Sequence, residues 1–107
     1  MTAPMAIAFV QFRLKAPLTA DAARALFEVT APRYLGAPDL IRKSYFRSDA
    51  GDLVGAIYEW RSRAAGEALY DAAWRARVTA HYGAEPEVTW LETPVVVDNL
   101  VGEIVRP

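Results

Sequence analysis

The side chains best suited to chemistry in this sequence are aromatic rings that carry a polar tip. Tyr45, Tyr58 and Trp60 fall within the stretch LIRKSYFRSDAGDLVGAIYEW (40–60), and Trp74 follows in the next segment. A phenol or an indole can hydrogen-bond a carbonyl group while its ring packs against a flat apolar ligand. We therefore predict that these four residues line a cavity for a small hydrophobic or aromatic molecule. The alternative is that each lies in the core or at a subunit interface.

Two further residues are candidates for a catalytic role. Arg42 could hold an anion or an enolate, although an ion pair with Glu59 on a neighbouring strand would make it structural. His81 is the single histidine, and it normally titrates near neutral pH. This property suits a general base or an axial haem ligand. In the alternative, a protonated His81 stabilises the C-terminal end of a helix.

The composition argues against several other classes of protein. The net charge is −1, with 12 basic and 13 acidic residues, so no basic surface for nucleic acid is expected. The chain has no cysteine and one histidine, which disfavours disulfides, thiolate chemistry and a metal site built from several histidines. No apolar run is long enough to cross a bilayer or resembles a signal peptide. We expect a cytoplasmic globular protein that binds no metal and no membrane.

The stretch 40–60 predicts a β-hairpin, because two runs rich in aromatic and β-branched residues flank the turn residues 48–52. A two-residue turn at Ala50-Gly51 pairs Asp49 with Asp52 and places Arg42 opposite Glu59. One face then carries Arg42, Ser44, Phe46, Gly55, Ile57 and Glu59, and the other carries Ile41, Lys43, Tyr45, Arg47, Val54, Ala56, Tyr58 and Trp60. The spacing leaves open which face lies under the helices.

The remaining elements follow from periodicity and capping residues. Residues 5–14 predict a strand that is apolar on both faces. A helix should begin after Thr19 and run to about Tyr34, with a kink or an early end at Pro32. A second helix over 62–83 should bend or break near Tyr70, where Asp71 can cap a new helix.

The C-terminal part predicts a strand over 87–97 that Pro94 interrupts, which favours a position at the edge of the sheet. The order β-α-β-β-α-β is typical of the α+β ferredoxin-like fold, a four-stranded antiparallel sheet with both helices on one face. We expect a single domain over 1–107, with a core of about 5–98 and a tail of 99–107. The apolar tail suggests that it docks on another surface, and the apolar residues on both faces of the first strand suggest that the sheet of a second subunit covers its outer side.

Four segments resemble one family: 40–47 (LIRKSYFR), 55–62 (GAIYEWRS), 70–77 (YDAAWRAR) and 90–98 (WLETPVVVD). They are similar to the YdhR-like family of proposed monooxygenases, over roughly residues 5–98. That family belongs to the dimeric α/β-barrel superfamily, with the antibiotic-biosynthesis monooxygenases and haem-degrading relatives. The resemblance implies a homodimer whose sheets pack face to face, with a cavity between each sheet and its own helices.

The resemblance also implies an activity, because enzymes of that superfamily oxidise anthrone-like substrates with O₂ and need neither metal nor flavin. Their site uses Asn, Trp and Tyr or Arg, roles that Trp60, Trp74, Tyr45, Tyr58 and Arg42 could take here. The first strand has no Asn, and Gln11 is the nearest substitute. We expect a cofactor-independent monooxygenase-like protein. The alternatives are a non-catalytic dimeric protein that binds a small molecule, and a haem-binding relative that uses His81 with Trp74.

Overall fold

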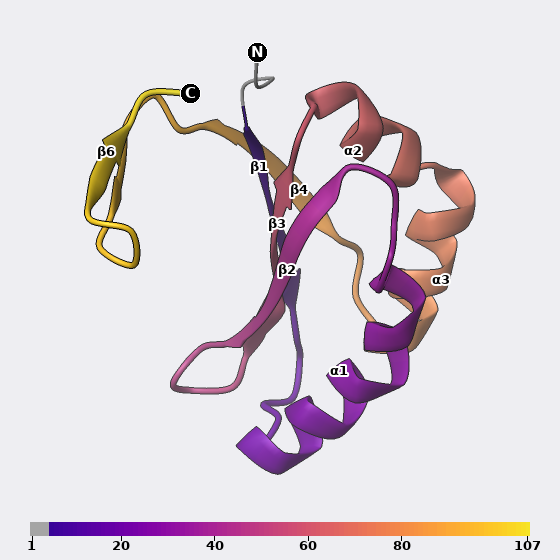
Figure 1. Ribbon diagram of the computed structural model, residues 1–107. Helices are drawn as coiled ribbons and strands as arrows, with labels where there is room; N and C mark the ends of the chain where they lie inside the picture. The colour runs from indigo at the N-terminus through magenta and orange to yellow at the C-terminus, as the bar shows by residue number, and fades with distance from the viewer. Residues whose placement is uncertain (1–4) are drawn as a thin grey trace.

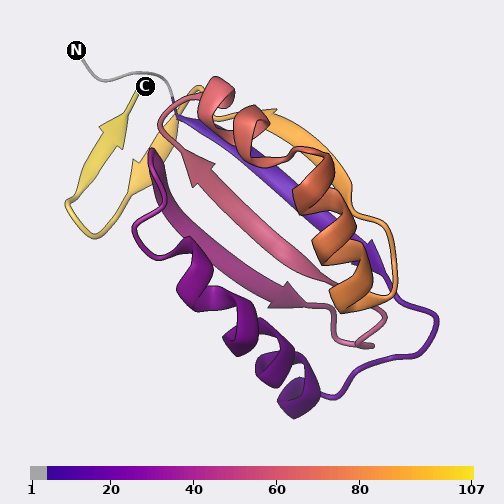
Figure 2. The same cartoon turned by 90° about the vertical axis from the view of Figure 1, so that its right-hand side faces the viewer.

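The elements follow one another in the order expected for a ferredoxin-like fold, and the computed structural model describes them over residues 5–107. They are β1 (Ala6–Arg13), α1 (Ala20–Tyr34), β2 (Leu40–Arg47), β3 (Leu53–Trp60), α2 (Arg63–Leu69), α3 (Ala72–Tyr82), β4 (Glu87–Glu92), β5 (Val96–Asp98) and β6 (Glu103–Val105). The main sheet has the antiparallel order β2-β3-β1-β4, and all three helices cover one of its faces (Figures 1 and 2). The predicted fold class is therefore confirmed. Over the same residues, no helix is both long and apolar enough to cross a membrane.

The register predicted for the β2–β3 hairpin is confirmed, but its turn is longer than predicted. Arg42 lies opposite Glu59, and the later pairs follow as far as Arg47 and Val54. The loop comprises the four residues 49–52, because the Ser48 amide donates to the Leu53 carbonyl at 2.8 Å. Because the turn is longer by one residue on each strand, the pairs farther from the turn stay as predicted.

A β-bulge sets the direction of the side chains at the start of β2. Leu40 pairs with Trp60 and Arg42 pairs with Glu59, so Ile41 is the extra residue. The extra residue shifts the alternation by one position. The predicted alternation therefore does not extend to Ile41. Leu40 packs against the core instead, and Ile41 is exposed.

The helix α1 begins and ends where the sequence predicts, but Pro32 does not end it early. The Thr19 side chain caps the helix by accepting from the Ala22 amide at 3.1 Å. Pro32 lies inside the helix, which continues to Tyr34. Because Pro32 is in the last turn, its missing N–H removes a single hydrogen bond and little helix remains to be disrupted.

The predicted break in the next helical segment is confirmed. The helix α2 ends at Leu69, and α3 begins after Asp71, whose carboxylate accepts from the Trp74 amide at 2.8 Å. Gly83 ends α3 with a φ of 70°, in the left-handed region that favours glycine. The break turns the chain so that α3 runs above the sheet beside α1 (Figure 2).

The strand predicted over 87–97 is wrong beyond Glu92. The strand β4 lies at the edge of the sheet as predicted, but it ends two residues before Pro94, which has no N–H to donate. The chain then forms a separate hairpin of β5 and β6. Figure 1 shows this hairpin extending from the sheet on the side away from the helices. Its apolar residues are exposed, Leu100 at 92%.

The core lies between the sheet and the helices. Its buried residues come from alternate positions of β1 and β3 and from two helices: Ala8, Val10, Phe12, Val54, Ala56, Tyr58, Trp60, Tyr34, Trp74 and Val78.

The opposite side of the sheet, called the outer face below, carries Phe9, Phe46, Ile57 and Leu91. Phe9 packs against Phe46 at 5.2 Å between ring centroids, while Ile57 and Leu91 are exposed. The outer face thus carries an apolar patch that is partly exposed in the single chain, beside polar residues such as Arg42 and Glu59.

Gly66 in α2 provides a test of this packing. A Cβ at this position would lie 2.4 Å from Trp90 Cη2 and 2.9 Å from Trp60 Nε1. We expect Gly66→Ala to lower the free energy of unfolding by about 1–3 kcal/mol, although alanine is the better helix former by about 1 kcal/mol. Urea denaturation measures this change. The control is Ala68→Gly on the exposed side of α2, which should cost less than about 1 kcal/mol. A stabilised Gly66→Ala protein would contradict the prediction.

Candidate functional site

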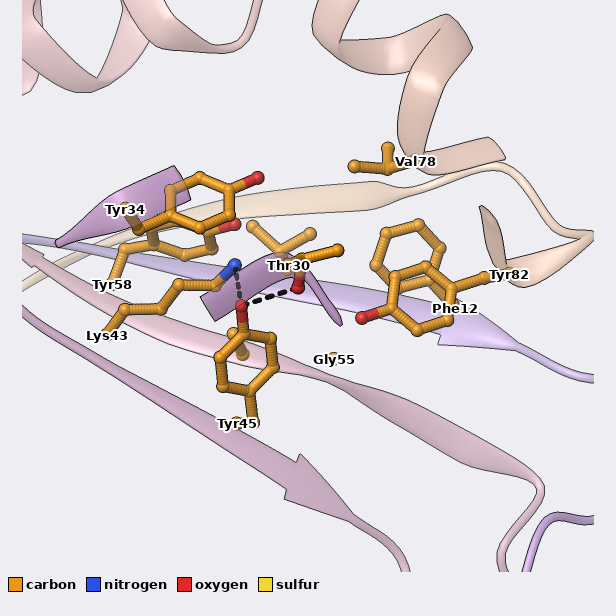
Figure 3. A pocket seen from close by; sticks show the side chains of 11 residues that line it. Phe12, Thr30, Tyr34, Lys43, Tyr45, Gly55, Tyr58, Val78 and Tyr82 are labelled. Atoms are coloured by element: carbon orange, nitrogen blue, oxygen red, sulfur yellow. Dashed lines mark hydrogen bonds between the residues drawn. The ribbon is translucent and has the colours of Figure 1, made fainter. Parts of the chain in front are cut away.

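A small cavity lies between the sheet and the helices α1 and α3. Its volume is about 10 Å³, which is room for about one water molecule. The lining residues are Val10, Phe12, Thr30, Tyr34, Lys43, Tyr45, Gly55, Ala56, Tyr58, Val78 and Tyr82. Figure 3 shows the amine of Lys43 and the hydroxyls of Thr30 and Tyr45 close together among these rings. The cavity therefore combines apolar walls with one cluster of polar atoms.

Lys43 is the basic group of this cavity. Its Nζ lies 3.4 Å from the ring centroid of Tyr34, 4.1 Å from that of Tyr45 and 4.8 Å from that of Tyr58. Its polar partner is the Tyr45 hydroxyl, at 2.8 Å. No carboxylate is found among the residues that line the cavity. The amine is thus enclosed by aromatic faces instead of being held in an ion pair.

This environment favours the neutral amine. Burial lowers the pKa of Lys43 to about 6, because the charged form loses its hydration. The ring faces act in the opposite direction, since they attract an ammonium group. Of these two effects desolvation is the larger, so most Lys43 side chains are uncharged at neutral pH. A neutral amine can accept a proton or attack an electrophile.

The hydroxyl groups beside Lys43 form a chain with a defined direction. Thr30 Oγ1 donates to the Phe27 carbonyl at 3.2 Å, so Tyr45 donates its proton to Thr30 Oγ1, at 2.7 Å. Tyr45 is then free to accept from Lys43 Nζ. Burial raises the pKa values of the Tyr45, Tyr58 and Tyr82 phenols, which therefore stay protonated at neutral pH. The chain gives the amine a path for proton exchange.

A cleft of about 240 Å³ opens on the surface between α1 and β2. It is lined by Ala31, Tyr34, Leu35, Gly36, Leu40, Ile41, Arg42, Lys43 and Tyr45. Three of these residues, Tyr34, Lys43 and Tyr45, also line the cavity. They therefore separate the cavity from the cleft, and Lys43 can be reached from the surface.

A larger cleft of about 770 Å³ lies at the ends of β1 and β4, beside the start of α2. Arg63 stacks on Trp90 there, with the guanidinium carbon 5.1 Å from the ring centroid. None of the residues predicted for the site lines this cleft.

The structure places the four predicted aromatic residues in two different settings. Tyr45 and Tyr58 line the cavity. Trp60 and Trp74 are each 1% exposed and lie in the core behind it. The Trp60 indole donates to the Tyr70 hydroxyl at 3.1 Å, and the Trp74 indole donates to the Tyr34 hydroxyl at 3.2 Å. The two tryptophans therefore support the walls of the cavity.

Arg42 and His81 lie away from the cavity. Arg42 borders the outer cleft, and its Nε lies 3.6 Å from a carboxylate oxygen of Glu59. His81 lies in the last turn of α3, with Nε2 3.0 Å from the Leu26 carbonyl oxygen. Arg42 shares this cleft with Tyr45 but does not line the cavity, and His81 lines neither space. Over residues 5–107, no group of three His, Cys, Asp or Glu residues could hold a metal ion.

The sequence analysis did not assign a role to Lys43, Tyr34, Thr30 or Tyr82. Lys43 carried a usable signal, because the confirmed register places it opposite Tyr58 and on the same strand face as Tyr45. A lysine on such a face must be either at the edge of the sheet or desolvated. Thr30 and Tyr82 gave no comparable signal, since their approach to Lys43 depends on how the helices pack.

Solved structures share this fold. No family model and no curated protein sequence matches the chain. The ActVA-Orf6 monooxygenase of Streptomyces coelicolor, solved with nanaomycin D, is 16% identical, with a TM-score of 0.63 over 86% of this chain and 88% of that chain. A point mutant of SnoaB, a cofactor-independent oxygenase from Streptomyces nogalater, is 18% identical, with a TM-score of 0.66 over 91% and 100%. Rv0793 from Mycobacterium tuberculosis is 21% identical, with a TM-score of 0.59 over 85% and 95%. At these identities the likeness shows a common fold.

The lowered pKa of Lys43 predicts how stability depends on pH. Between about pH 6 and pH 10 the unfolded chain binds a proton at Lys43 that the folded chain does not bind. Wild-type stability should therefore rise with pH relative to Lys43→Met, by at most about 1.4 kcal/mol per pH unit. Urea denaturation at pH 6, 7.5 and 9 measures this difference. The exposed Lys15→Met is the control and should show no such trend. A constant difference between wild type and Lys43→Met would contradict the lowered pKa.

Proposed function

We propose that this protein is a cofactor-independent monooxygenase-like enzyme that oxidises a flat, carbonyl-bearing molecule of aromatic or polyketide type with O₂. The observation that carries the proposal is the Lys43 amine, enclosed by tyrosine rings and hydrogen-bonded to Tyr45. Such a site offers a base, hydroxyl groups and an apolar surface for a planar substrate.

In the proposed reaction, Lys43 removes a proton from the carbon next to the substrate carbonyl. The resulting enolate passes electrons to O₂ and forms a carbon–oxygen bond, and the peroxide takes the proton back from Lys43 to give a hydroperoxide. Loss of water from the hydroperoxide leaves a new carbonyl group, so one oxygen atom enters the product and the other leaves as water. To stabilise the enolate oxygen, the Tyr45 hydroxyl turns its proton from Thr30 Oγ1 to the substrate, and the apolar walls strengthen this hydrogen bond by excluding water.

Two of the structural neighbours support the choice of reaction. SnoaB is a cofactor-independent oxygenase, and ActVA-Orf6 is a monooxygenase that was solved with nanaomycin D. We propose by analogy that this chain also works without a cofactor. Membership of the YdhR-like family remains part of the proposal and rests on the four sequence segments given above.

The size of the site sets a condition on the mechanism. The cavity has room for one water molecule, and the adjoining cleft of about 240 Å³ is smaller than the roughly 300–1,000 Å³ of sites for drug-sized ligands. The substrate must therefore displace Lys43, Tyr34 or Tyr45 as it enters. These three side chains form the wall between cleft and cavity, so their rotation would join the two spaces.

The closed cavity favours a second candidate function, that of a non-catalytic protein that binds a small molecule. The Tyr34, Tyr45 and Thr30 hydroxyls already have hydrogen-bond partners inside the protein. Such a protein would bind an aromatic ligand in the cleft and would show no turnover. The haem alternative requires His81 Nε2 to exchange its contact with the Leu26 carbonyl for iron.

The turnover of anthrone-type substrates tests the proposed function. We expect O₂-dependent oxidation above the buffer rate, absent under nitrogen, and about a 100-fold or greater loss of kcat in Lys43→Met. The rate should rise with pH through about 6, because the base must be neutral. Lys15→Met is the matched control and should retain activity.

The same assay separates the competing assignments. A larger loss in Arg42→Ala or His81→Gln than in Lys43→Met would reject Lys43 as the base. Binding of an aromatic substrate without any turnover would favour the non-catalytic alternative.

We also propose that the protein is a homodimer that packs through the outer face, with the β5–β6 hairpin contributing to the contact. The support is apolar exposure: Ile57 and Leu91 on the outer face are 40% and 47% exposed, and Leu100 in the hairpin is 92% exposed. A second copy of the sheet could bury these side chains, because two sheets pack face to face through such surfaces.

Light scattering tests the proposed dimer. The wild-type protein should show twice the mass of one chain at micromolar concentration, and Ile57→Glu should shift it to the monomer because it would bury a charge. Val29→Glu is the control, since Val29 is 71% exposed on α1. A monomeric wild-type protein, or dissociation caused equally by both substitutions, would reject this interface.

A further inference from the structure

We infer that Lys43 is also a nucleophilic amine that forms an imine with a small, neutral aldehyde or ketone entering through the α1–β2 cleft. This reaction differs from the proposed oxidation, because it uses the nitrogen lone pair to form a covalent bond and needs no O₂. The inference rests on three features of the structure: the surroundings of the amine, its access from the surface and the hydroxyl groups beside it.

The surroundings leave the amine without an ionic partner. The titratable groups that face it are all phenols: Tyr34 on α1, Tyr45 on β2, Tyr58 on β3 and Tyr82 on α3. No carboxylate or histidine occurs among the residues that line the cavity or the cleft. Desolvation therefore favours the neutral, nucleophilic form, and burial lowers the pKa of Lys43 to about 6.

The amine is also accessible to a small reagent. Lys43 lines both the cavity and the cleft of about 240 Å³, so a carbonyl compound in the cleft reaches Nζ once Lys43, Tyr34 or Tyr45 rotates. Figure 3 shows Nζ directed toward the group of hydroxyls and rings. The volume of the cleft suits a compound of a few carbon atoms or a single ring.

The hydroxyl chain supplies the proton transfers that imine formation requires. The Lys43 nitrogen attacks the carbonyl carbon, a C–N bond forms, and the carbonyl electron pair moves to oxygen. Tyr45, which lies 2.8 Å from Nζ and 2.7 Å from Thr30 Oγ1, can pass a proton from the nitrogen to that oxygen. The carbinolamine then loses water. The amine and the carbonyl compound thus give an imine and water, with no change in oxidation state.

The site should prefer a neutral carbonyl compound to an anionic one. The walls around Nζ are aromatic and aliphatic. Arg42 is the other cationic residue that borders the cleft, and it lies beside Glu59, which offsets its charge. A carboxylate would therefore be desolvated without a free cation to pair with.

Reductive trapping of the wild-type protein tests this inference. The protein is incubated at pH 7 with propionaldehyde and sodium cyanoborohydride, which delivers hydride to the imine carbon and fixes the adduct. Peptide mass spectrometry then measures alkylation at each site. The chain contains two lysines, Lys43 and the exposed Lys15, so Lys15 is an internal control in the same molecule. We expect Lys43 to react at least about tenfold faster, because burial keeps its amine largely neutral at this pH.

The pH profile and one variant make the test sharper. Alkylation of Lys43 should increase up to about pH 6–7 and then level off, and a profile that coincides with that of Lys15 would contradict the inference. Tyr45→Phe should slow the reaction at Lys43 several-fold and leave Lys15 unchanged, with an unaltered circular dichroism spectrum as the check on folding. Pyruvate should label Lys43 more slowly than propionaldehyde does.

The outcomes test imine formation at Lys43 separately from the proposed oxidation. Equal rates at the two lysines, or slower reaction at Lys43, would overturn it. Faster labelling with pyruvate would overturn the preference for neutral compounds. Rapid trapping at Lys43 in a protein without oxidase turnover would support the imine and reject the oxidation, and turnover without trapping would do the reverse.

Discussion

The structure depends on hydrogen bonds to the phenol hydroxyls and indole N–H groups of the large rings that fill the space between the sheet and the helices. The largest buried rings come from β3 (Tyr58 and Trp60), from α1 (Tyr34) and from α3 (Trp74). Each buried hydroxyl or N–H group must then form a hydrogen bond inside the protein, because an unpaired polar group in the core destabilises the fold. Trp60 donates to Tyr70, Trp74 donates to Tyr34, and Tyr45 donates to Thr30.

Lys43 has a different place in this arrangement, because no acid compensates its charge. Its neighbours are ring faces and one hydroxyl, so the protein keeps it largely as a neutral amine. The alternation of β2 contributes to this separation. It places Arg42 beside Glu59 at the outer face, whereas the next residue points under the helices. Two adjacent basic residues thus have opposite environments, and only the one under the helices is suited to act as a base.

The two faces of the sheet differ in what they contain. The helix-facing side holds the cavity and the core, while the outer face and the β5–β6 hairpin remain apolar and exposed. The ActVA-Orf6 and SnoaB structures show that the same scaffold occurs in oxygenases, but identities of 16% and 18% do not carry individual site residues to this chain. The case for chemistry therefore depends on the local geometry around Lys43.

Much of the architecture could be predicted from the sequence, because it depends on local signals. Alternation and turn residues determined the pairing of Arg42 with Glu59, and capping residues determined the break before Asp71. The candidate site was predicted only in part. Tyr45 and Tyr58 were identified from their shared strand face, whereas Lys43 joins Thr30 only after α1 packs over β2. That contact and the enclosure that lowers the pKa of Lys43 are decided by tertiary packing. No spacing along the chain encodes how much water reaches a side chain.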